Sequence, residues 1–591
     1  MRARDVHSFA EPEKVRVTHC SLALEASFGK RALSGSAELR LQRFDAHAPL
    51  LLDTRDLKIH RIESRGREVA HRIGARDAIL GSPLEIDLPA GADSVLIHYS
   101  ASEQASGLQW LTPEQTGGKS RPFLFSQNQS IHARSWIPIQ DSPGVRITYD
   151  ARIKPDLDLR VVMSARSEGI EDGFYRFRMD LPIPAYLVAI AIGEIDFRSL
   201  GPRTGVYAEP MLLDAAVSEF SDLERLLAAV EGLYGPYRWG RYDVLVLPPS
   251  FPFGGMENPV ITFATPTIIA GDKSLIGLIS HELAHSWSGN LVTNATWRDF
   301  WLNEGFTTYI ENRIQEEVYG REQALMEQVL DRRELEKELA EFEPRDQILH
   351  IDLAGRDPED GTTRVPYIKG ALFVRQMEEA FGRPVFDRFL MAYFEHFAFR
   401  SITTEEALAF IRRELFERYG SADKQIPIDE WVFGPGLPAS APTAISAPLE
   451  QISEAAGAWI AGMFDAAAIP GRTWNTQEWL EFLQVLPRPL TLAKVSELDA
   501  AWRLTATGNY EILDEWLQMA IESRYEPADQ RLESFLINVG RMKYLKPLYK
   551  ELMKTPEGRA RAHHIYAKAR SGYHPIAQTA IDKIVSGSKG E

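Results

Sequence analysis

Residues 281–285 read His-Glu-Leu-Ala-His, a pattern that supplies two metal ligands and a general base when the segment is helical. On a helix, side chains four residues apart lie on the same face, so His281 and His285 can bind one metal ion. Glu282 points elsewhere but can reach a water at an open position of that ion and act as a general base. A third ligand must come from another element, and Glu304, in the sequence Trp-Leu-Asn-Glu-Gly, is placed to provide it. Two imidazoles, a carboxylate and a water form the open zinc set that hydrolyses amides.

Residues 274–279, directly before the motif, read Ser-Leu-Ile-Gly-Leu-Ile and favour a buried helix over a solvated one. The alternative is an ordinary helix whose two histidines bind no metal. Glu304 argues against that alternative, and two imidazoles with one carboxylate in four-coordinate geometry favour zinc over manganese or cobalt. A ligand imidazole also needs an outer hydrogen-bond partner, and Glu311 or Thr308, on the same helix face as Glu304, could provide it. A solvent-exposed surface position is the alternative for Glu311.

The motif and its surroundings resemble the aminopeptidase N type of the zinc gluzincin family. Residues 254–258 read Gly-Gly-Met-Glu-Asn before the motif, and residues 367–370 read Tyr-Ile-Lys-Gly after it. Within the family, the chain resembles above all leukotriene A4 hydrolase and its bacterial aminopeptidase relatives. This second likeness rests on residues 247–259 and on residues 540–543, which read Gly-Arg-Met-Lys. The resemblance covers essentially the whole chain.

The resemblance implies that Tyr367 stabilises the oxyanion that forms as the scissile carbonyl becomes tetrahedral. A phenol suits this role because it remains protonated at neutral pH. Towards the carboxyl end, Arg541 and Lys543 resemble the pair that binds the free carboxylate of the substrate. A guanidinium can bind a carboxylate through two parallel hydrogen bonds, which favours short peptides whose carboxyl end reaches it. Without the resemblance, Tyr367 would be interpreted as a core residue, and Arg541 and Lys543 as two cations on a solvent-exposed helix face.

Removal of amino-terminal residues also requires a group that binds the free α-ammonium, and the family likeness assigns this role to Glu257. Gly254 and Gly255 let the backbone approach the substrate closely, and Met256 belongs to the same motif. Gln127, in the sequence Phe-Ser-Gln-Asn-Gln, resembles a second contact to the amine and the peptide. An isolated Gly-Gly-Met-Glu would otherwise indicate a tight turn with a solvated glutamate.

The chain departs from the leukotriene A4 hydrolase branch shortly before Tyr367. Glu359 stands where vertebrate members carry Asp, and Thr362 stands where they carry Tyr. One added methylene moves a carboxylate by about an ångström, which is enough to misdirect a water in a tight site. These residues therefore argue against efficient hydrolysis of a lipid epoxide. Glu359 could instead line the pocket for the first side chain of the peptide, where a carboxylate would favour an amino-terminal Arg or Lys.

The composition is that of a soluble globular enzyme, with 44% hydrophobic and 25% charged residues. Lys and Arg number 66 against 83 Asp and Glu, and a net charge of −17 repels phosphate backbones, which argues against nucleic-acid partners. The single cysteine, Cys20, excludes an intrachain disulfide and a thiolate zinc set. The amino terminus lacks the apolar run of a signal peptide, and the apolar run 185–192 is too short to span a bilayer. We therefore expect a cytoplasmic protein without a membrane partner.

The apolar pattern divides the chain into three parts. From about residue 15 to 195 apolar residues alternate, as in Leu22, Leu24 and Ala26, which predicts an antiparallel β domain. Afterwards, residues 220–234 and 274–288 have helical spacing with a short strand between them, which suits a thermolysin-like α/β catalytic domain. Helical periodicity dominates the last part, without a fixed-period repeat, and predicts a domain of stacked helices.

We therefore expect a multidomain α+β protein. Its amino-terminal β domain covers residues 1–196, and its zinc catalytic domain covers residues 197–433. A linker rich in Pro and Ala follows over residues 434–448, and an all-α domain over residues 449–591. The resemblance implies that the active site lies in a cleft where the domains meet.

The leading hypothesis is a zinc aminopeptidase that binds one zinc ion and acts on small peptides with a free amino terminus. The alternative is a bifunctional epoxide hydrolase and aminopeptidase like leukotriene A4 hydrolase. A silent peptide-binding scaffold is disfavoured because all four residues of the zinc motif are present, and an endopeptidase is disfavoured by Glu257. We expect a monomer, although the sequence does not decide the oligomeric state, the preferred first residue or the physiological peptide.

Overall fold

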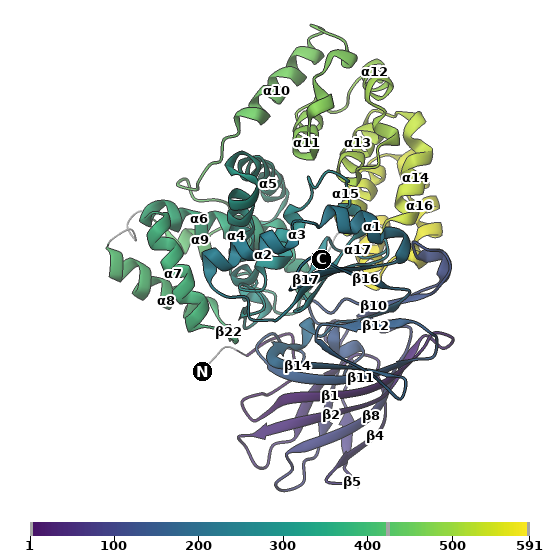
Figure 1. Ribbon diagram of the computed structural model, residues 1–591, viewed down its shortest axis with the longest axis vertical. Helices are drawn as coiled ribbons and strands as arrows, with labels where there is room; N and C mark the ends of the chain where they lie inside the picture. The colour runs from purple at the N-terminus through teal and green to yellow at the C-terminus, as the bar shows by residue number, and fades with distance from the viewer. Residues whose placement is uncertain (1–3, 421–425, 588–591) are drawn as a thin grey trace.

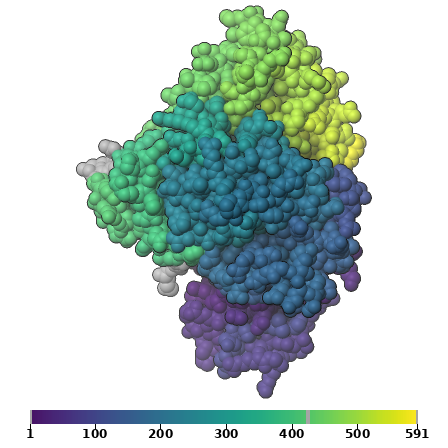
Figure 2. Space-filling model, in the orientation of Figure 1, coloured from purple at the N-terminus to yellow at the C-terminus, as the bar shows by residue number. Residues whose placement is uncertain are grey.

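The computed structural model describes residues 4–420 and 426–587, and it has three parts that follow one another along the chain (Figure 1). A β-rich part lies at one end, a helical part at the other, and a mixed part between them. The three parts are in contact in the space-filling view (Figure 2). This arrangement confirms the predicted fold class. Residues 1–3 of the segment for which the sequence predicts no signal peptide lie outside the described residues.

The first part is built on the alternation of apolar and polar residues. In β1 (Val15–Ser27), the side chains of Leu22, Leu24 and Ala26 are buried and their neighbours are more exposed. Eight strands form one sheet in the order β13-β14-β11-β1-β2-β8-β4-β5. Its pairs are antiparallel except β1 with β11, which is parallel. The other strands of this sheet are β2 (Ala32–Arg43), β4 (Lys58–Ser64), β5 (Arg67–Glu68), β8 (Ser94–Ala101), β11 (Arg146–Pro155), β13 (Arg166–Glu171) and β14 (Phe174–Pro184).

Two smaller sheets complete this part, and one of them leads into the loop that carries Gln127. A three-stranded sheet has the order β3-β7-β6, and a four-stranded sheet has the order β12-β15-β10-β9. Strand β10 ends at Ser126, directly before Gln127, so this sheet positions the loop that carries Gln127. The strands are β3 (Leu50–Thr54), β6 (His71–Ile73), β7 (Ser82–Ile86), β9 (Leu108–Leu111), β10 (Phe123–Ser126), β12 (Arg160–Met163) and β15 (Ile190–Gly193).

The middle part combines a mixed sheet with a bundle of helices. Its five strands have the order β16-β17-β18-β20-β19, and β21 (Val292–Asn294) pairs with β22 (Arg400–Ile402). The strands of the larger sheet are β16 (Asp196–Ser199), β17 (Thr204–Ala208), β18 (Tyr242–Val246), β19 (Gly255–Met256) and β20 (Ile261–Ala264). The helices are α1 (Pro210–Glu219), α2 (Leu223–Tyr234), α3 (Gly277–Ala284), α4 (Trp301–Tyr319), α5 (Arg321–Glu341), α6 (Gly370–Phe381), α7 (Arg383–His396), α8 (Thr404–Ile411) and α9 (Ile428–Phe433).

The third part consists of helices with their own core. Its buried residues, such as Trp459, Trp516 and Leu545, form a cluster separate from the one shared by the other two parts, and Phe253 packs against both. Among the described helices, none is both long and apolar enough to cross a membrane. The helices of this part are α10 (Ala447–Ile460), α11 (Thr476–Gln484), α12 (Leu492–Trp502), α13 (Tyr510–Glu522), α14 (Asp529–Asn538), α15 (Met542–Met553), α16 (Pro556–Ala569) and α17 (Pro575–Val585).

Candidate metal centre and active site

Helices α3 and α4 bring together the three side chains that the sequence predicts as metal ligands. His281 lies in the last turn of α3, His285 caps the same helix, and Glu304 lies in the first turn of α4. Glu304 Oε2 lies 3.2 Å from His281 Nε2 and 3.5 Å from His285 Nε2. A tetrahedral zinc site with bonds of about 2.0–2.1 Å places neighbouring ligand atoms about 3.4 Å apart. The three donor atoms therefore have the spacing and the chemistry that zinc requires.

The outer nitrogens of both imidazoles have partners, which leaves each Nε2 free to bind a metal. Nδ1 of His281 lies 2.8 Å from Glu311 Oε2. Nδ1 of His285 lies 3.0 Å from the carbonyl oxygen of Ser288 and 3.1 Å from Thr307 Oγ1. The prediction that Thr308 could serve in this way is wrong, since its hydroxyl has no hydrogen-bond partner among the described residues. Thr307, the preceding residue of α4, faces α3 instead, and its hydroxyl contacts the imidazole of His285.

Glu282 is buried next to this centre, and one of its carboxyl oxygens has no hydrogen-bond partner among the described residues. Only 6% of the residue is exposed, and Oε2 makes no hydrogen bond within the described part of the chain. A Cβ atom added to Gly255 would lie 2.3 Å from Glu282 Oε1, so only a glycine lets strand β19 approach this closely. Burial raises the pKa of the Glu282 carboxyl, and the Glu257 and Glu304 carboxylates raise it further. A carboxyl in these surroundings is suited to accept a proton and pass it on.

Tyr367 lies beside the metal ligands in a π-helical turn, Val365–Lys369. Its ring stacks on the ring of His281, with centroids 5.9 Å apart, and packs edge-on against Phe300. Burial raises the pKa of the Tyr367 phenol, and the Glu304 carboxylate raises it further. The phenol therefore remains a hydrogen-bond donor throughout the physiological range.

The residues that the resemblance assigns to the substrate amine also lie together. Glu257 is 2% exposed, and its Oε1 has no hydrogen-bond partner among the described residues. Burial raises its pKa to about 7. Single ligand atoms of Glu257, Glu282 and His285 all lie within 4.8 Å of one another. From the β part, Gln127 Nε2 contacts Met256 Sδ at 3.2 Å, and no described residue forms a hydrogen bond with the Gln127 side-chain oxygen, Oε1.

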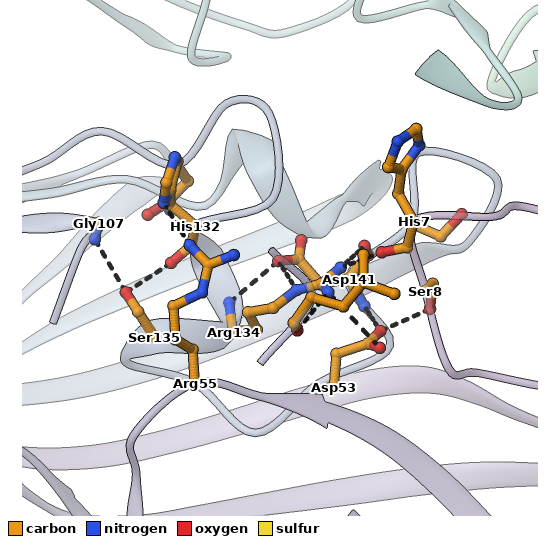
Figure 3. A network of polar contacts seen from close by, with 12 residues as sticks. His7, Ser8, Asp53, Arg55, Gly107, His132, Arg134, Ser135 and Asp141 are labelled. Atoms are coloured by element: carbon orange, nitrogen blue, oxygen red, sulfur yellow. Dashed lines mark hydrogen bonds and ion pairs between the residues drawn. The ribbon is translucent and has the colours of Figure 1, made fainter. Parts of the chain in front are cut away.

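A buried ion-pair network includes Arg134, which follows Gln127 by seven residues (Figure 3). Arg134 is fully buried, and its guanidinium donates to Asp141 Oδ2 at 3.0 Å and to the carbonyl oxygen of His7 at 2.7 Å. Asp53 accepts from the amide of Asp141 at 2.9 Å. The sequence does not reveal this network, because its members lie far apart along the chain.

The structure brings Arg541 and Lys543 together around one carboxylate, Glu511. Arg541 Nη1 lies 3.0 Å from Glu511 Oε1, and Lys543 Nζ lies 2.6 Å from Glu511 Oε2. A Cβ atom added to Gly254 would lie 2.8 Å from Arg541 Nη2, so the guanidinium also reaches the Gly-Gly segment. The amide of Met542 donates to the carbonyl oxygen of Pro252 at 2.8 Å. Arg541 and Met542 of the helical part therefore contact residues 252–254, shortly before Glu257.

Glu359 contacts the β part through the same loop that carries Gln127. Its Oε1 accepts hydrogen bonds from the amide of Ser130 at 2.8 Å and from the Ser130 hydroxyl at 2.9 Å. Burial raises the pKa of Glu359 to about 7, and the Asp357 carboxylate contributes to the increase. Thr362 lies close by, since its amide donates to the carbonyl oxygen of Glu359 at 3.1 Å.

Comparison with known proteins finds matches along the whole chain. Family models match the peptidase M1 N-terminal domain over residues 16–187, the peptidase family M1 domain over 219–428, and the leukotriene A4 hydrolase C-terminal domain over 474–585. A leukotriene A-4 hydrolase from Xenopus laevis is 36% identical, with 98% of each chain covered. Leucine aminopeptidase 2 from Yarrowia lipolytica is also 36% identical, with 98% of this chain and 93% of that protein covered.

Solved structures give the same result for the fold. Yeast LTA4 hydrolase in complex with bestatin superimposes with a TM-score of 0.92 at 32% identity, and the match covers 99% of this chain and 97% of that one. An M1 zinc metallopeptidase from Deinococcus radiodurans matches 74% of this chain and all of its own, with a TM-score of 0.60 at 22% identity. At that identity, the second match supports the fold alone.

Proposed function

The chain belongs to peptidase family M1 and carries the leukotriene A4 hydrolase C-terminal domain, and from this premise we propose that it releases amino-terminal residues from small peptides. The family makes the protein a zinc metallopeptidase. The observation that carries the proposal is the buried carboxyl of Glu257, whose Oε1 has no hydrogen-bond partner among the described residues and which has a ligand atom within 4.8 Å of those of Glu282 and His285. An ammonium bound there leaves room for only one residue before the reacting carbonyl.

Each proposed catalytic residue has a separate task. His281, His285 and Glu304 would hold the zinc ion, which when bound would polarise the scissile carbonyl and make water more acidic. Glu282 removes a proton from the attacking water and gives it to the departing amine; its Oε2 is not engaged in a hydrogen bond within the described part of the chain. Tyr367 donates a hydrogen bond to the oxygen on which negative charge develops.

We propose that substrate binding uses both ends of a short peptide. Glu257 and Gln127 bind the amino terminus, and the glycines 254 and 255 let the Met256 backbone lie against the peptide. Arg541 and Lys543 bind the carboxylate at the other end. These two cations face the single carboxylate of Glu511, so one positive charge remains for the substrate.

The proposal is tested with aminoacyl p-nitroanilides and tripeptides, each with a free or an acetylated amino terminus. We expect hydrolysis of the free forms only, loss of activity with a chelator and recovery when zinc is restored. Glu282→Gln should still bind zinc, as shown by metal analysis, and should lose activity roughly 10²–10⁴-fold. Near wild-type turnover by the zinc-loaded variant, or equal hydrolysis of acetylated peptides, would exclude the proposed mechanism.

The alternative activity is epoxide hydrolysis, which the full-length similarity to Xenopus leukotriene A-4 hydrolase supports. Glu359 and Thr362 argue against it, because the carboxyl of Glu359 is held by Ser130. We propose instead that Glu359 lines the pocket for the first side chain. Comparing the rates on an aminoacyl anilide and a fatty-acid epoxide decides between the two activities.

A further inference from the structure

One face of helix α5 carries four acidic residues, and only half of them are paired with a cation. Glu327, Asp331, Glu334 and Glu338 are spaced by four, three and four residues, so they follow one line along the helix. Arg364 lies 3.5 Å from Glu334 Oε2 and 3.8 Å from Glu338 Oε1. Within residues 4–420 and 426–587, no Lys, Arg or His lies within 4.0 Å of the carboxylate of Glu327 or Asp331.

The unpaired half of this line lies beside the metal centre. A Cβ atom added to Gly277, the first residue of α3, would lie 3.1 Å from Glu327 Oε1 and 3.5 Å from Glu311 Oε1. The carboxylates of Glu327 and Glu311 therefore both lie next to Gly277. Glu311 is also the residue that contacts Nδ1 of His281. Gln323, four residues before Glu327 on α5, donates from Nε2 to Glu327 Oε1 at 3.5 Å, so a neutral amide and not a cation contacts this carboxylate. Burial raises the pKa of Asp331 to about 6, and Glu311 contributes to that increase.

A buried amide from the helical part adds a second observation at the same place. Gln477, in α11, is 6% exposed, and its Nε2 donates to the carbonyl oxygen of Ser274 at 2.7 Å and contacts Glu327 Oε1 at 3.4 Å. Both partners are acceptors, which fixes the orientation of the amide. Its Oε1 has no hydrogen-bond partner in the described part of the chain. The cluster therefore offers a buried acceptor without a hydrogen-bond partner next to Glu327, a carboxylate that has no cation partner among the described residues.

We propose that Glu327, Asp331 and Gln477 form a subsite for a cationic side chain, guanidinium or ammonium, on the carboxyl side of the scissile bond. This inference rests on the proposed peptidase function. The cluster is bounded by Glu311 behind His281 and by Lys543, whose positive charge acts on Asp331. Lys543 belongs to the proposed carboxylate end, so the subsite serves residues that follow the cleaved bond.

The spacing of the acceptors selects an organic cation over a second metal ion. Among the described residues, the zinc ligands form a group whose atoms all lie within 4.8 Å, whereas Glu311, Glu327 and Asp331 do not form such a group. A guanidinium presents five donors across a plane and can bind separate carboxylates and an amide oxygen at once. Glu327 and Asp331 are half-buried, so a substrate side chain can reach them.

The test compares arginine with citrulline, which has the same shape and no charge. The substrates are Ala-Arg-Ala and Ala-Ala-Arg, each with its citrulline counterpart. We expect kcat/KM to favour arginine roughly tenfold at one of the two positions, the size of effect that a partly desolvated charge pair gives. In Glu327→Gln combined with Asp331→Asn, this ratio should fall to about one. Glu334→Gln, on the same helix face but paired with Arg364, should retain the wild-type ratio.

An alanyl p-nitroanilide separates failure of this inference from failure of the proposed function, because it has no residue after the cleaved bond. If wild type hydrolyses neither the anilide nor the tripeptides, the aminopeptidase proposal fails. If it hydrolyses them with an arginine-to-citrulline ratio near one at both positions, the subsite inference alone is overturned. A preference that persists in the double variant, after normalisation to its own anilide rate, also overturns it.

Discussion

The carboxylate of Glu511 is predicted to hold the helical part of the molecule together around Arg541. Arg541 is buried, and its Nη1 lies 3.0 Å from Glu511 Oε1 and 2.7 Å from the Tyr544 hydroxyl. Lys543 Nζ and the Tyr544 hydroxyl also donate to Glu511, at 2.6 and 2.9 Å. In Glu511→Gln the negative charge is lost, and the guanidinium remains buried without a counter-ion. Removing one member of a buried pair is destabilising because the other charge cannot return to water.

The pKa of Glu511 gives the size of this effect. Burial alone would raise the pKa, but Lys543 and Arg541 outweigh burial and lower it from 4.5 to about 2. A difference of this size corresponds to about 3 kcal/mol of folding free energy. Because the folded-state pKa is the lower one, this contribution is fully present above pH 4.5. It is lost as the pH falls from 4.5 toward 2.

The assay is urea unfolding of wild type and Glu511→Gln at pH 7, 4 and 3. We expect the variant to be less stable by about 3 kcal/mol at pH 7, and by less than half of that at pH 3. Glu533→Gln is the matched control in the same part of the chain, because Glu533 pairs with Lys568 at an exposed position. It should change stability far less than Glu511→Gln. Equal stability of wild type and Glu511→Gln at pH 7, or a difference that does not shrink in acid, would refute the reasoning.

Two predictions concern the metal and the first side-chain pocket. Glu311→Gln should weaken zinc binding roughly 10–100-fold, because Glu311 orients and polarises His281. Zinc affinity is measured by competition with a chelating dye, and Glu317→Gln, at an exposed position of the same helix, is the control. Unchanged zinc affinity in Glu311→Gln would contradict the assignment. The kcat/KM ratio of arginyl to citrullinyl anilide should increase between pH 6 and pH 8, because the pKa of Glu359 is raised to about 7 and only its ionised form attracts the guanidinium. Glu359→Gln should give a flat ratio, and a flat ratio in wild type would exclude Glu359 from the pocket.

Much of the fold could be predicted because the evidence for it is local. Alternation in β1 buries Leu22 and Leu24 on one face, and this period is visible in any short window of sequence. The spacing of His281 and His285 likewise depends only on the helical repeat, so their convergence follows once the segment is helical. The parallel pairing of β1 with β11 was outside the reach of such reasoning, because pairing between distant strands leaves no periodic signal.

The sequence by itself determined the donor types of the candidate zinc set, the three-part order of strands and helices, and the absence of any disulfide. Only the tertiary structure decided which side chains meet from distant segments. Glu359 contacts Ser130, Arg541 reaches Gly254, and Gln477 contacts Glu327 across the junction between the middle and helical parts. The physical reason is that helix and strand periods fix directions over a few residues, whereas contacts between distant segments depend on how whole layers pack against one another.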